Sequence, residues 1–388
     1  MHVVVIGAGI IGLSIAWRTA RAGARVSVCD PAPVSGATRA AAGMLAPVAE
    51  TYHRERDLGD LCLASARAYP EFLADLVGDT DGAPTGRVTT GTVICGLDAA
   101  DRGALTDLHE LAVSLGLDSR QLTTREARRL EPLLGPGLSC TFFAPDDHHL
   151  DPRALAAALL RALDRHGGHV VPARVAAVVH RDPGDPASPV AGVLLSDGRV
   201  LEADAVVVAN AVAAGDLEGL PIDLRPALRP VYGDILRLTP PPHLRGLLTR
   251  TIRGYALGHP AYLVPRPDGT VVLGATSRED GSPHVSAGGV YALLRDAIRL
   301  VPAVAEYALT ETLARPRPGT PDNAPLLGGL GADGLIAATG FFRHGVLLAP
   351  AAARLVTGLL GLDGPAAAPP AFDPRRFTES LQRKEPVL

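Results

Sequence analysis

Residues 3–30 constrain the fold of this chain more than any other stretch. Residues 3–6 are apolar and β-branched, a composition typical of a strand buried on both faces. Three glycines at G-x-G-x-x-G spacing follow at once: Gly7, Gly9 and Gly12. Residues 10–22 have the pattern of a helix, residues 25–29 that of a second strand, and Asp30 closes that strand. This order predicts a βαβ unit of the kind that binds a dinucleotide.

Each glycine of the triplet has a separate task in such a unit. Gly7 allows the tight turn, Gly9 lets the backbone approach a pyrophosphate, and Gly12 lets the helix pack close to the strand. The helix then directs its free N–H groups and its positive dipole end at the phosphate. Asp30 places a carboxylate where a ribose diol would lie. The triplet alone leaves two alternatives: a βαβ unit without a nucleotide, and an NAD-dependent dehydrogenase.

The composition is that of a globular protein with a large core, because 47% of the 388 residues are hydrophobic and 20% are charged. A net charge of −4 gives no basic surface for nucleic acid or for a membrane anchor. No apolar run is long enough to span a membrane, and the N-terminus lacks the basic start of a signal peptide. The cysteines form no C-x-x-C motif, which predicts reduced thiols in the cytoplasm: Cys29, Cys62, Cys95 and Cys140.

The chain alternates between two patterns along its length. Residues 205–209 and 335–340 repeat the buried-strand pattern of the N-terminus, and residues 345–360 predict a final apolar helix. Residues 225–310 instead hold alternating strands, with a Pro-Asp-Gly turn at 267–269, as in an antiparallel sheet. The chain is therefore expected to leave its first domain and return to it.

We predict an α/β fold, with a Rossmann-like domain of the FAD/NAD(P)-binding type and a second, α+β domain that carries an antiparallel sheet and binds substrate. The predicted cofactor domain is discontinuous and comprises residues 1–50, 145–225 and 315–375. The predicted substrate domain comprises residues 51–144 and 226–314.

One cluster resembles a metal site by residue type: Asp146, Asp147, His148 and His149. Adjacent histidines cannot easily face one ion from a loop, and no second cluster supports them. We therefore expect no metal. Asp151 is expected to cap a helix that opens with Pro152.

Several stretches that span nearly the full chain carry a family resemblance: VVVIGAGIIGLSIA at the start, GATRAAAGMLAP at 36–47, PDDHHLDPRALAAAL at 145–159, RPGTPDNAPLLG at 317–328 and TGFFRHGVLLAP at 339–350. In this order they resemble the D-amino-acid oxidase superfamily of FAD-dependent amine oxidases, and within it the glycine oxidase group of thiamine biosynthesis. The first stretch is common to many flavoproteins, whereas the last two together are much more specific. The resemblance implies a D-amino-acid oxidase-like fold and FAD rather than NAD. The FAD is expected to be non-covalent, because no cysteine lies in the C-terminal half, where relatives that tether FAD carry one.

The resemblance also implies which residues contact FAD. They are Gly7, Gly9, Ile10, Ile11, Gly12, Asp30, Pro31, Ala37, Thr38, Ala42, Gly43, Met44, Val175, Phe341, Phe342, Arg343, His344, Gly345, Val346 and Leu347. Ile10 and Ile11 would meet the pyrophosphate, Asp30 the adenosine ribose, and the backbone of Val175 the adenine. The segment 341–347 would wrap the isoalloxazine. A helix beginning near Gly345 would direct its N–H groups at the flavin N1/C2=O edge and stabilise the reduced anion.

The same resemblance implies three substrate-binding residues. Arg343 matches the arginine that pairs with the substrate carboxylate, Arg317 a second arginine, and Tyr262 a tyrosine near that carboxylate. The residues themselves leave alternatives: Arg343 in a structural ion pair, Arg315 in the place of Arg317, and Tyr262 as an ordinary strand aromatic. Two histidines are weaker candidates for a catalytic base: His259 and His344.

The implied activity is oxidative deamination of glycine or another small amino acid to an imine, and then to an oxo acid, ammonia and hydrogen peroxide, with O2 as the electron acceptor. No side-chain base is required, because positioning and the flavin carry the reaction. Relatives form homotetramers, so a homo-oligomer is expected. Three stretches depart from the family pattern and leave the substrate open: Asn210 to Ala213, Pro230 to Asp234, and Arg315-Pro316. The alternatives are a flavin dehydrogenase or oxidase of a specialised pathway, and a non-catalytic FAD-binding subunit.

Overall fold

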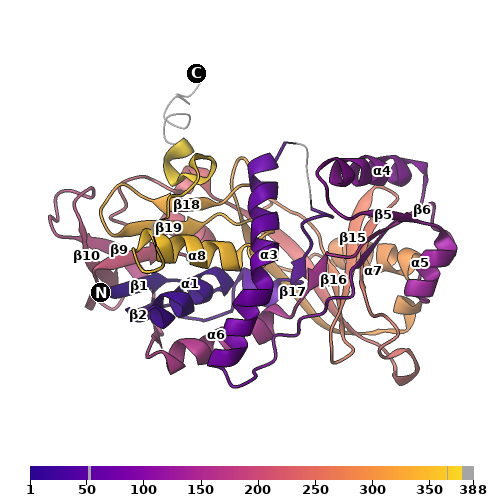
Figure 1. Cartoon of the computed structure of the whole chain (residues 1–388), viewed down its shortest axis with the longest axis horizontal. Coiled ribbons are helices and arrows are strands. Elements are labelled where there is room, and N and C mark those ends of the chain that lie inside the picture. Colours follow the sequence, from indigo (N-terminus) through magenta and orange to yellow (C-terminus); the bar gives the residue numbers. More distant parts are fainter. Residues whose placement is uncertain (51–53, 365, 378–388) are drawn as a thin grey trace.

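Two sheets lie side by side in the molecule, with the long helix α3 (Arg56–Asp79) between them in the view of Figure 1. The structure is a computed structural model, and it describes residues 1–50, 54–364 and 366–377. Among these residues, no helix is both long and apolar enough to cross a membrane.

The first sheet is parallel except at one edge. Its strands, in order across the sheet, are β18 (Leu326–Gly329), β19 (Leu335–Thr339), β12 (Ala205–Val208), β1 (His2–Ile6), β2 (Arg25–Cys29) and β8 (His169–Val171). Only β18 runs antiparallel to its neighbour. β1 lies in the centre, in register with Val26 on one side and Val206 on the other, so its apolar residues are buried on both faces as predicted.

Helices cover one face of this sheet, and a smaller sheet covers the other. The helices are α1 (Ile10–Arg21), α6 (Pro152–Arg165) and α8 (Ala349–Leu359), which pack with α3 around the buried Trp17. The smaller sheet comprises β9 (Val175–His180), β10 (Val190–Leu195) and β11 (Val200–Glu202). Its valines pack against Val4 and Val206 of the first sheet.

The second sheet is mixed and larger. Its strands, in order, are β17 (Ala308–Gly319), β13 (Arg229–Thr239), β16 (Val271–Gly274), β15 (His259–Pro265), β14 (Thr251–Ala256), β4 (Thr92–Gly96), β6 (Cys140–Ala144) and β5 (Arg120–Leu122). Only the pair β14–β4 is parallel.

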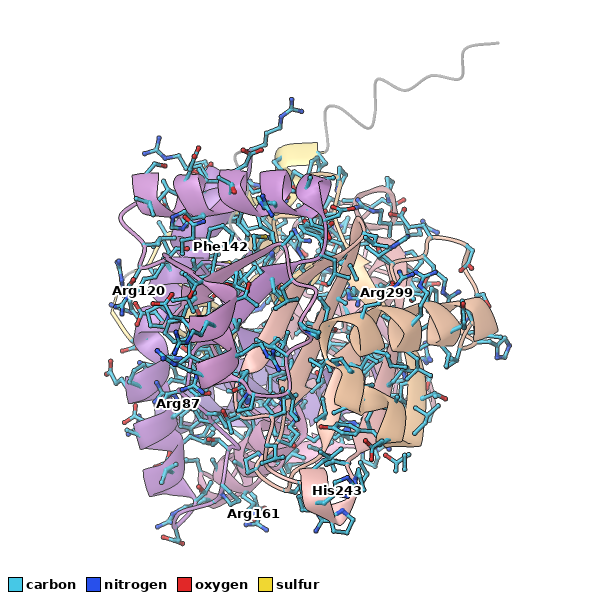
Figure 2. All side chains as sticks on the ribbon, turned by 90° about the vertical axis from the view of Figure 1, so that its right-hand side faces the viewer. Arg87, Arg120, Phe142, Arg161, His243 and Arg299 are labelled. Atoms are coloured by element: carbon cyan, nitrogen blue, oxygen red, sulfur yellow. The ribbon has the colours of Figure 1, made fainter. Side chains whose placement is uncertain are left out.

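Helices pack on both faces of the second sheet. α7 (Ala287–Leu300) and α5 (Thr124–Leu130) cover one face, where Leu293 meets Leu263 and Leu273. α4 (Ala99–Ser114) crosses one end of the opposite face, above Phe142 (Figure 2). The rest of that opposite face is turned toward the first sheet.

Short elements join these layers. A two-stranded ribbon pairs β3 (Met44–Leu45) with β7 (His148–His149), and α2 (Ala37–Ala40) follows the β2 loop. The 3-10 helices are Ala211–Asp216, Arg225–Ala227, Pro242–Leu244, Pro302–Glu306, Pro370–Phe372 and Pro374–Phe377.

The predicted fold class is confirmed: a parallel dinucleotide-binding sheet is combined with a largely antiparallel second sheet. The exact division into segments stays a prediction, and its boundary at residue 315 falls inside β17. The helix expected from residue 345 begins later, at Ala349. The chain first makes tight turns, with φ of 72° at Gly340 and 45° at Phe342, and Pro350 fits the first turn of the helix that follows.

A pair of glycine substitutions tests the packing of α1. A Cβ at Gly12 would lie 1.9 Å from the carbonyl oxygen of Gly7, whereas a Cβ at Gly59 in α3 would meet nothing within 4 Å. We expect Gly12→Ala to lower the free energy of unfolding by about 1–3 kcal/mol, because the strand and the helix are forced apart. Gly59→Ala should raise it by about 0.5–1 kcal/mol through the lower entropy of the unfolded chain. Urea unfolding measures both, and equal effects would contradict the close contact.

Candidate active site

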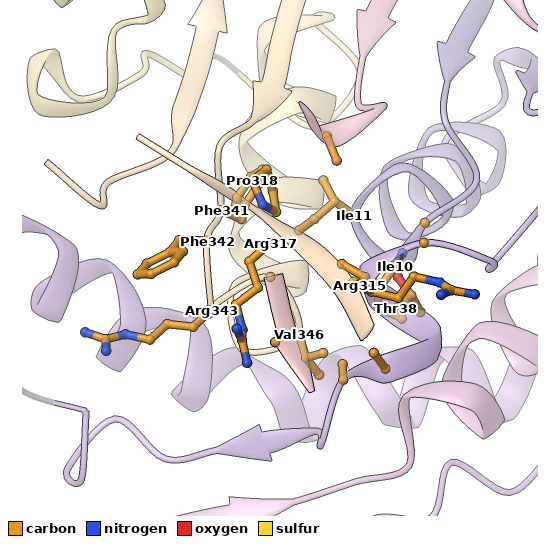
Figure 3. A pocket seen from close by; sticks show the side chains of 18 of the residues that line it. Ile10, Ile11, Thr38, Arg315, Arg317, Pro318, Phe341, Phe342, Arg343 and Val346 are labelled. Carbon is orange, nitrogen blue, oxygen red and sulfur yellow. Dashed lines mark hydrogen bonds between the residues drawn. The ribbon is translucent and has the colours of Figure 1, made fainter. Parts of the chain in front are cut away.

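A cavity of about 880 Å³ lies between the two sheets, at the carboxyl ends of the parallel strands (Figure 3). Its walls come from segments far apart in sequence, including the β1–α1 turn, the β2 loop, β14, β15, β17 and the turns before α8. The crevice at the carboxyl ends of an open parallel sheet is the usual ligand site of such folds.

At one end of the cavity the backbone forms a glycine-lined cradle. Gly7 has φ of 105°, and a Cβ there would lie 2.7 Å from the carbonyl oxygen of Ala209. The Oγ1 atom of Thr38 accepts a hydrogen bond from the N–H of Ile10 at 2.9 Å. The carboxylate of Asp30 accepts hydrogen bonds from the N–H groups of Ala8 and Ala32, at 2.7 and 2.8 Å, and lines the cavity. Hydrogen bonds therefore join the β1–α1 turn to the loop that follows β2, and both segments line the cavity.

Several polar groups of the cradle have no partner within the described part of the chain. α1 begins at Ile10, and its N-cap residue Gly9 has no side chain to cap it. Thr38 accepts from the N–H of Ile10, but the N–H of Ile11, which also lines the cavity, donates to no acceptor in the described chain. The Oδ1 atom of Asn210 is buried in the wall without a hydrogen-bond partner. At the other end of the cavity, the N–H groups of Gly345 and Val346 donate to no acceptor within the described part of the chain. Donors for a pyrophosphate at one end and for a ring carbonyl at the other fit FAD.

Most of the residues predicted to contact FAD line this cavity, and three do not. Gly12 lies behind the cradle, where its lack of a side chain brings α1 onto β1. His344 is only 2% exposed and lies beside Glu50, and Leu347 belongs to the core around α1. His344 and Leu347 point away from the cavity because successive residues in the turns before α8 face the cavity and the interior by turns.

At the opposite end, a row of residues crosses the second sheet on one face. Cross-strand register places Arg253 opposite Tyr262, Tyr262 opposite Gly274, and Gly274 opposite Ile235. A Cβ at Gly274 would lie 2.3 Å from the hydroxyl of Tyr262, and a Cβ at Gly233 would lie 2.2 Å from Nη1 of Arg317. The two glycines therefore leave the room that the tyrosine and the arginine occupy.

Three arginines near the cavity point in three directions (Figure 3). Arg317 points into the cavity, where its Nη1 donates to the carbonyl oxygen of Thr276 at 3.2 Å. No described carboxylate lies within ion-pair distance of it. Arg315 turns the other way, and its Nε donates to the carbonyl oxygen of Ser35 at 2.9 Å. The two arginines are thus not interchangeable, although they lie on the same strand.

Arg343 lies at the far side from Arg315, beside the ring of Phe342, with 5.5 Å between its Cζ and the ring centroid. Its Nε is 3.9 Å from Oε2 of Glu50, and its Nη2 is 3.8 Å from Oε2 of Glu55. Its side chain is 30% exposed. Arg343 lines the cavity but is engaged with carboxylates, as in the alternative of a structural ion pair.

Tyr262 and His259 have different environments although both belong to β15. Burial raises the pKa of Tyr262, and the charge of Arg317 opposes this rise. His259 is 62% exposed at its side chain, 4.0 Å from Asp296, and does not line the cavity. His259 is therefore not placed to act as a catalytic base.

Sequence reasoning missed an ion pair at this end of the cavity. Nη1 of Arg253 donates to Oε1 of Glu50 at 2.6 Å, and Nδ1 of His344 lies 3.1 Å from Oε2 of the same carboxylate. Burial alone would raise the pKa of Glu50, but the charge of Arg253, together with the nearby His344 and Arg343, outweighs burial and holds the pKa well below its ordinary value. The one available signal was Arg253, a charged residue inside a strand that holds no other charge.

Asp147 holds the backbone that carries Glu50. Its carboxyl oxygens accept hydrogen bonds from the N–H groups of Val48 and Ala49, at 2.9 and 2.8 Å. Burial raises the pKa of Asp147 to about 7. The neighbouring His149 makes a 3.0 Å contact with Oγ1 of Thr251 instead. Two of the four residues that resemble a metal cluster by type, Asp147 and His149, thus contact a loop and a strand instead.

Comparison with known proteins agrees with this geometry. The profile of the FAD dependent oxidoreductase family matches residues 2–359. The chain is 35% identical over its whole length to a bifunctional protein ThiO/ThiG of Synechocystis, of which it covers 55%. It is 31% identical to a glycine oxidase of Bacillus licheniformis, with 92% of each chain covered. It spans about half the length of the ThiO/ThiG relatives.

Solved structures are similar over nearly the full chain. A glycine oxidase from Geobacillus kaustophilus superimposes with a TM-score of 0.84 at 29% identity, covering 96% of this chain and 98% of that one. An iminodiacetate oxidase from Chelativorans gives a TM-score of 0.80 at 28% identity with the same coverage.

The raised pKa of Asp147 predicts a measurable pH dependence. The carboxyl binds its proton more tightly in the fold, with a pKa of about 7, than in an unfolded chain, where the ordinary value is 3.8. Its contribution to stability is complete below about pH 4 and is lost as the pH rises through 7. The quantity to follow is the difference between the free energies of unfolding of the wild type and of Asp147→Asn. We expect this difference to become smaller as the pH rises from 4 to 7. The exposed Asp164→Asn serves as a control, and a difference that stays constant with pH would refute the assignment.

Proposed function

This chain belongs to the FAD-dependent oxidoreductase family, and we propose that it is an oxidase that removes two electrons from the amine of glycine or another small amino acid. The single observation that carries the proposal is that Arg317 and Tyr262 both line the cavity wall, in the space left by Gly233 and Gly274 on adjacent strands. A cationic group and a hydroxyl that converge on one point are suited to a carboxylate.

FAD fits the glycine-lined cradle and supplies a hydride acceptor when bound. The donors at the first turn of α1 would hold its pyrophosphate, and Asp30 its ribose. The N–H groups of Gly345 and Val346 would contact the ring system. We propose that the FAD is held non-covalently, as expected from the positions of the cysteines.

Arg317 would bind the substrate carboxylate. A guanidinium offers two parallel donors that match a planar carboxylate, and the bond of Nη1 to Thr276 fixes its orientation. The hydroxyl of Tyr262 would donate a further hydrogen bond to the same group. Fixing the carboxylate at two points fixes the α-carbon, and this positioning is the main contribution of the protein to the rate.

The remaining charges keep the amine end of the site polar without supplying a base. The lowered pKa keeps Glu50 ionised and makes it a weak base, so it can accept a hydrogen bond from the amine without supplying or removing a proton. The net reaction converts the amino acid, O2 and water to an oxo acid, ammonia and hydrogen peroxide. No protonated side chain is consumed in it.

Two finer assignments are part of the proposal. A relative from Rhizobium etli is named a putative thiamine biosynthesis oxidoreductase ThiO, and we propose a role in thiamine biosynthesis here. The chain is expected in the cytoplasm. It is also expected to form a homo-oligomer, and analytical ultracentrifugation measures the oligomeric state. The second candidate function is a flavin dehydrogenase, and the solved L-proline dehydrogenase of the same fold makes it worth testing.

A peroxide-coupled screen tests the activity directly. Purified yellow protein is mixed under air with glycine, sarcosine and small D- and L-amino acids, and peroxide is measured. We expect peroxide with glycine or another small member of the set. Reduction of a dye without peroxide would indicate a dehydrogenase, and no turnover with any amine would refute the proposal.

Arginine substitutions test the carboxylate clamp. We expect Arg317→Ala to raise KM for the amino acid about 10- to 150-fold, because a charged hydrogen-bonded pair is lost. Arg317→Lys should recover part of this loss, since it keeps the charge but not the paired donors. Arg343→Ala should have a smaller effect, because the Arg343 guanidinium lies toward Glu50 and Glu55. A larger rise in KM for Arg343→Ala than for Arg317→Ala would assign the clamp to Arg343 instead.

A further inference from the structure

The cavity does not end at Arg317 and Tyr262. On the same face of the sheet, Arg253 lies opposite Tyr262, and two residues further along the strands Tyr255 lies opposite Pro260. All of these side chains line the one cavity. Two residues along a strand span about 7 Å, so the wall continues well past the point where a glycine would be held.

Helix α4 forms the other wall of this extension. Ala104, Leu108 and Leu111 are four and three residues apart, which places them on one face of the helix, and all three line the cavity. Leu108 and Leu111 are only partly buried, whereas Leu105 beside them belongs to the core. The apolar stripe of α4 is therefore turned partly into open space rather than into protein.

The chemistry of this extension, which we call the α4 channel, is apolar. It is lined by Ala49, Ile94, Ala104, Leu105, Leu108, Leu111, Tyr255 and Pro260. The acidic residue of α4 that also lines the channel, Asp107, is exposed to solvent. At the inner end, Glu50 and Arg253 neutralise each other through their 2.6 Å hydrogen bond. A substrate substituent that extends past the Glu50–Arg253 pair would therefore contact apolar side chains of α4 on one side and of the sheet on the other.

We propose that the α4 channel is a subsite for an apolar substituent of the substrate, a proposal that rests on the function proposed above. The substrate class is then amino acids that carry a straight alkyl chain, on the α-carbon or on the nitrogen, with their carboxylate at Arg317 and Tyr262. Burial of one CH2 group in such a channel favours binding about fourfold.

The reaction balances for both kinds of substrate. An amino acid with an α-alkyl chain, O2 and water give a 2-oxo acid, ammonia and hydrogen peroxide. An N-alkylglycine, O2 and water give glyoxylate, the alkylamine and hydrogen peroxide. In each case the C–H and N–H hydrogens of the amine end reduce O2, and water supplies the oxygen of the new carbonyl.

Chain-length series on the holoenzyme test the subsite. We expect kcat/KM to rise up to about fourfold per added CH2, over the first few carbons, in at least one of two series: N-methylglycine to N-butylglycine, and alanine to norleucine in both enantiomers. The series that rises identifies which atom of the substrate carries the substituent. Oxidation of glycine with no rise in either series would overturn this inference alone. No turnover of any amino acid would refute the proposed function itself.

A second readout avoids turnover. Straight-chain carboxylates from acetate to hexanoate have no amine and cannot be oxidised, so their Kd can be measured by perturbation of the flavin spectrum. We expect Kd to fall with each CH2 over the same range of lengths. A Kd that is independent of length would overturn the subsite even if a variant failed to fold.

Substitutions in α4 locate the effect. Leu111→Trp should reduce the ratio of kcat/KM for long over short substrates at least tenfold, and Leu111→Ala should move the preference toward longer chains. Val113→Trp is the matched control, because Val113 is on the same helix but is 51% exposed and does not line the cavity, so the ratio should stay at the wild-type value. If Leu111→Trp lowers kcat/KM equally for all lengths, the channel is only a route of entry and the proposal is wrong.

Discussion

The contact between the carbonyl of Gly7 and the first turn of α1 at Gly12 is the constraint on which the cofactor end depends. No side chain fits there, because a Cβ at Gly12 would overlap the Gly7 oxygen. This close approach keeps the first turn of α1 packed against the chain that follows β1. The helix donors, the Asp30 loop and the end of β12 therefore converge on one space, which the parallel order of β12, β1 and β2 keeps open at a single edge.

The substrate end follows the same rule with different residues. Gly233 and Gly274 lie on adjacent strands, and the absence of side chains there lets Arg317 and Tyr262 lie flat against the second sheet. Glycine thus makes room for the ligand at one end of the cavity and for ligand-binding side chains at the other. The α4 channel begins where this row of residues ends, so the same strands would set both the clamp and the length of substrate that fits.

Charge at the site is balanced through long-range pairs. Glu50 follows the β3 ribbon, Arg253 lies in β14, and both are held where burial would be costly for either one alone. Asp147 fixes the loop of Glu50 through two backbone amides. This network keeps the guanidiniums of Arg253 and Arg343 near carboxylates, whereas Arg317 is bonded to a backbone carbonyl and faces the cavity.

The sequence by itself determined the cofactor domain, because its signals are local: a β-branched run, glycines at fixed spacing and an acid at the end of the next strand all act within residues 3–30. The order of motifs along the chain was also sufficient for the family and for FAD. Only the tertiary structure decided which of the arginines faces Tyr262, since Arg315 and Arg317 share one side of β17 and differ only in what lies across from them. It also decided the pairing of Glu50 with Arg253 and the later start of α8, because partners that are distant in sequence and tight turns of the backbone leave no periodic pattern to read.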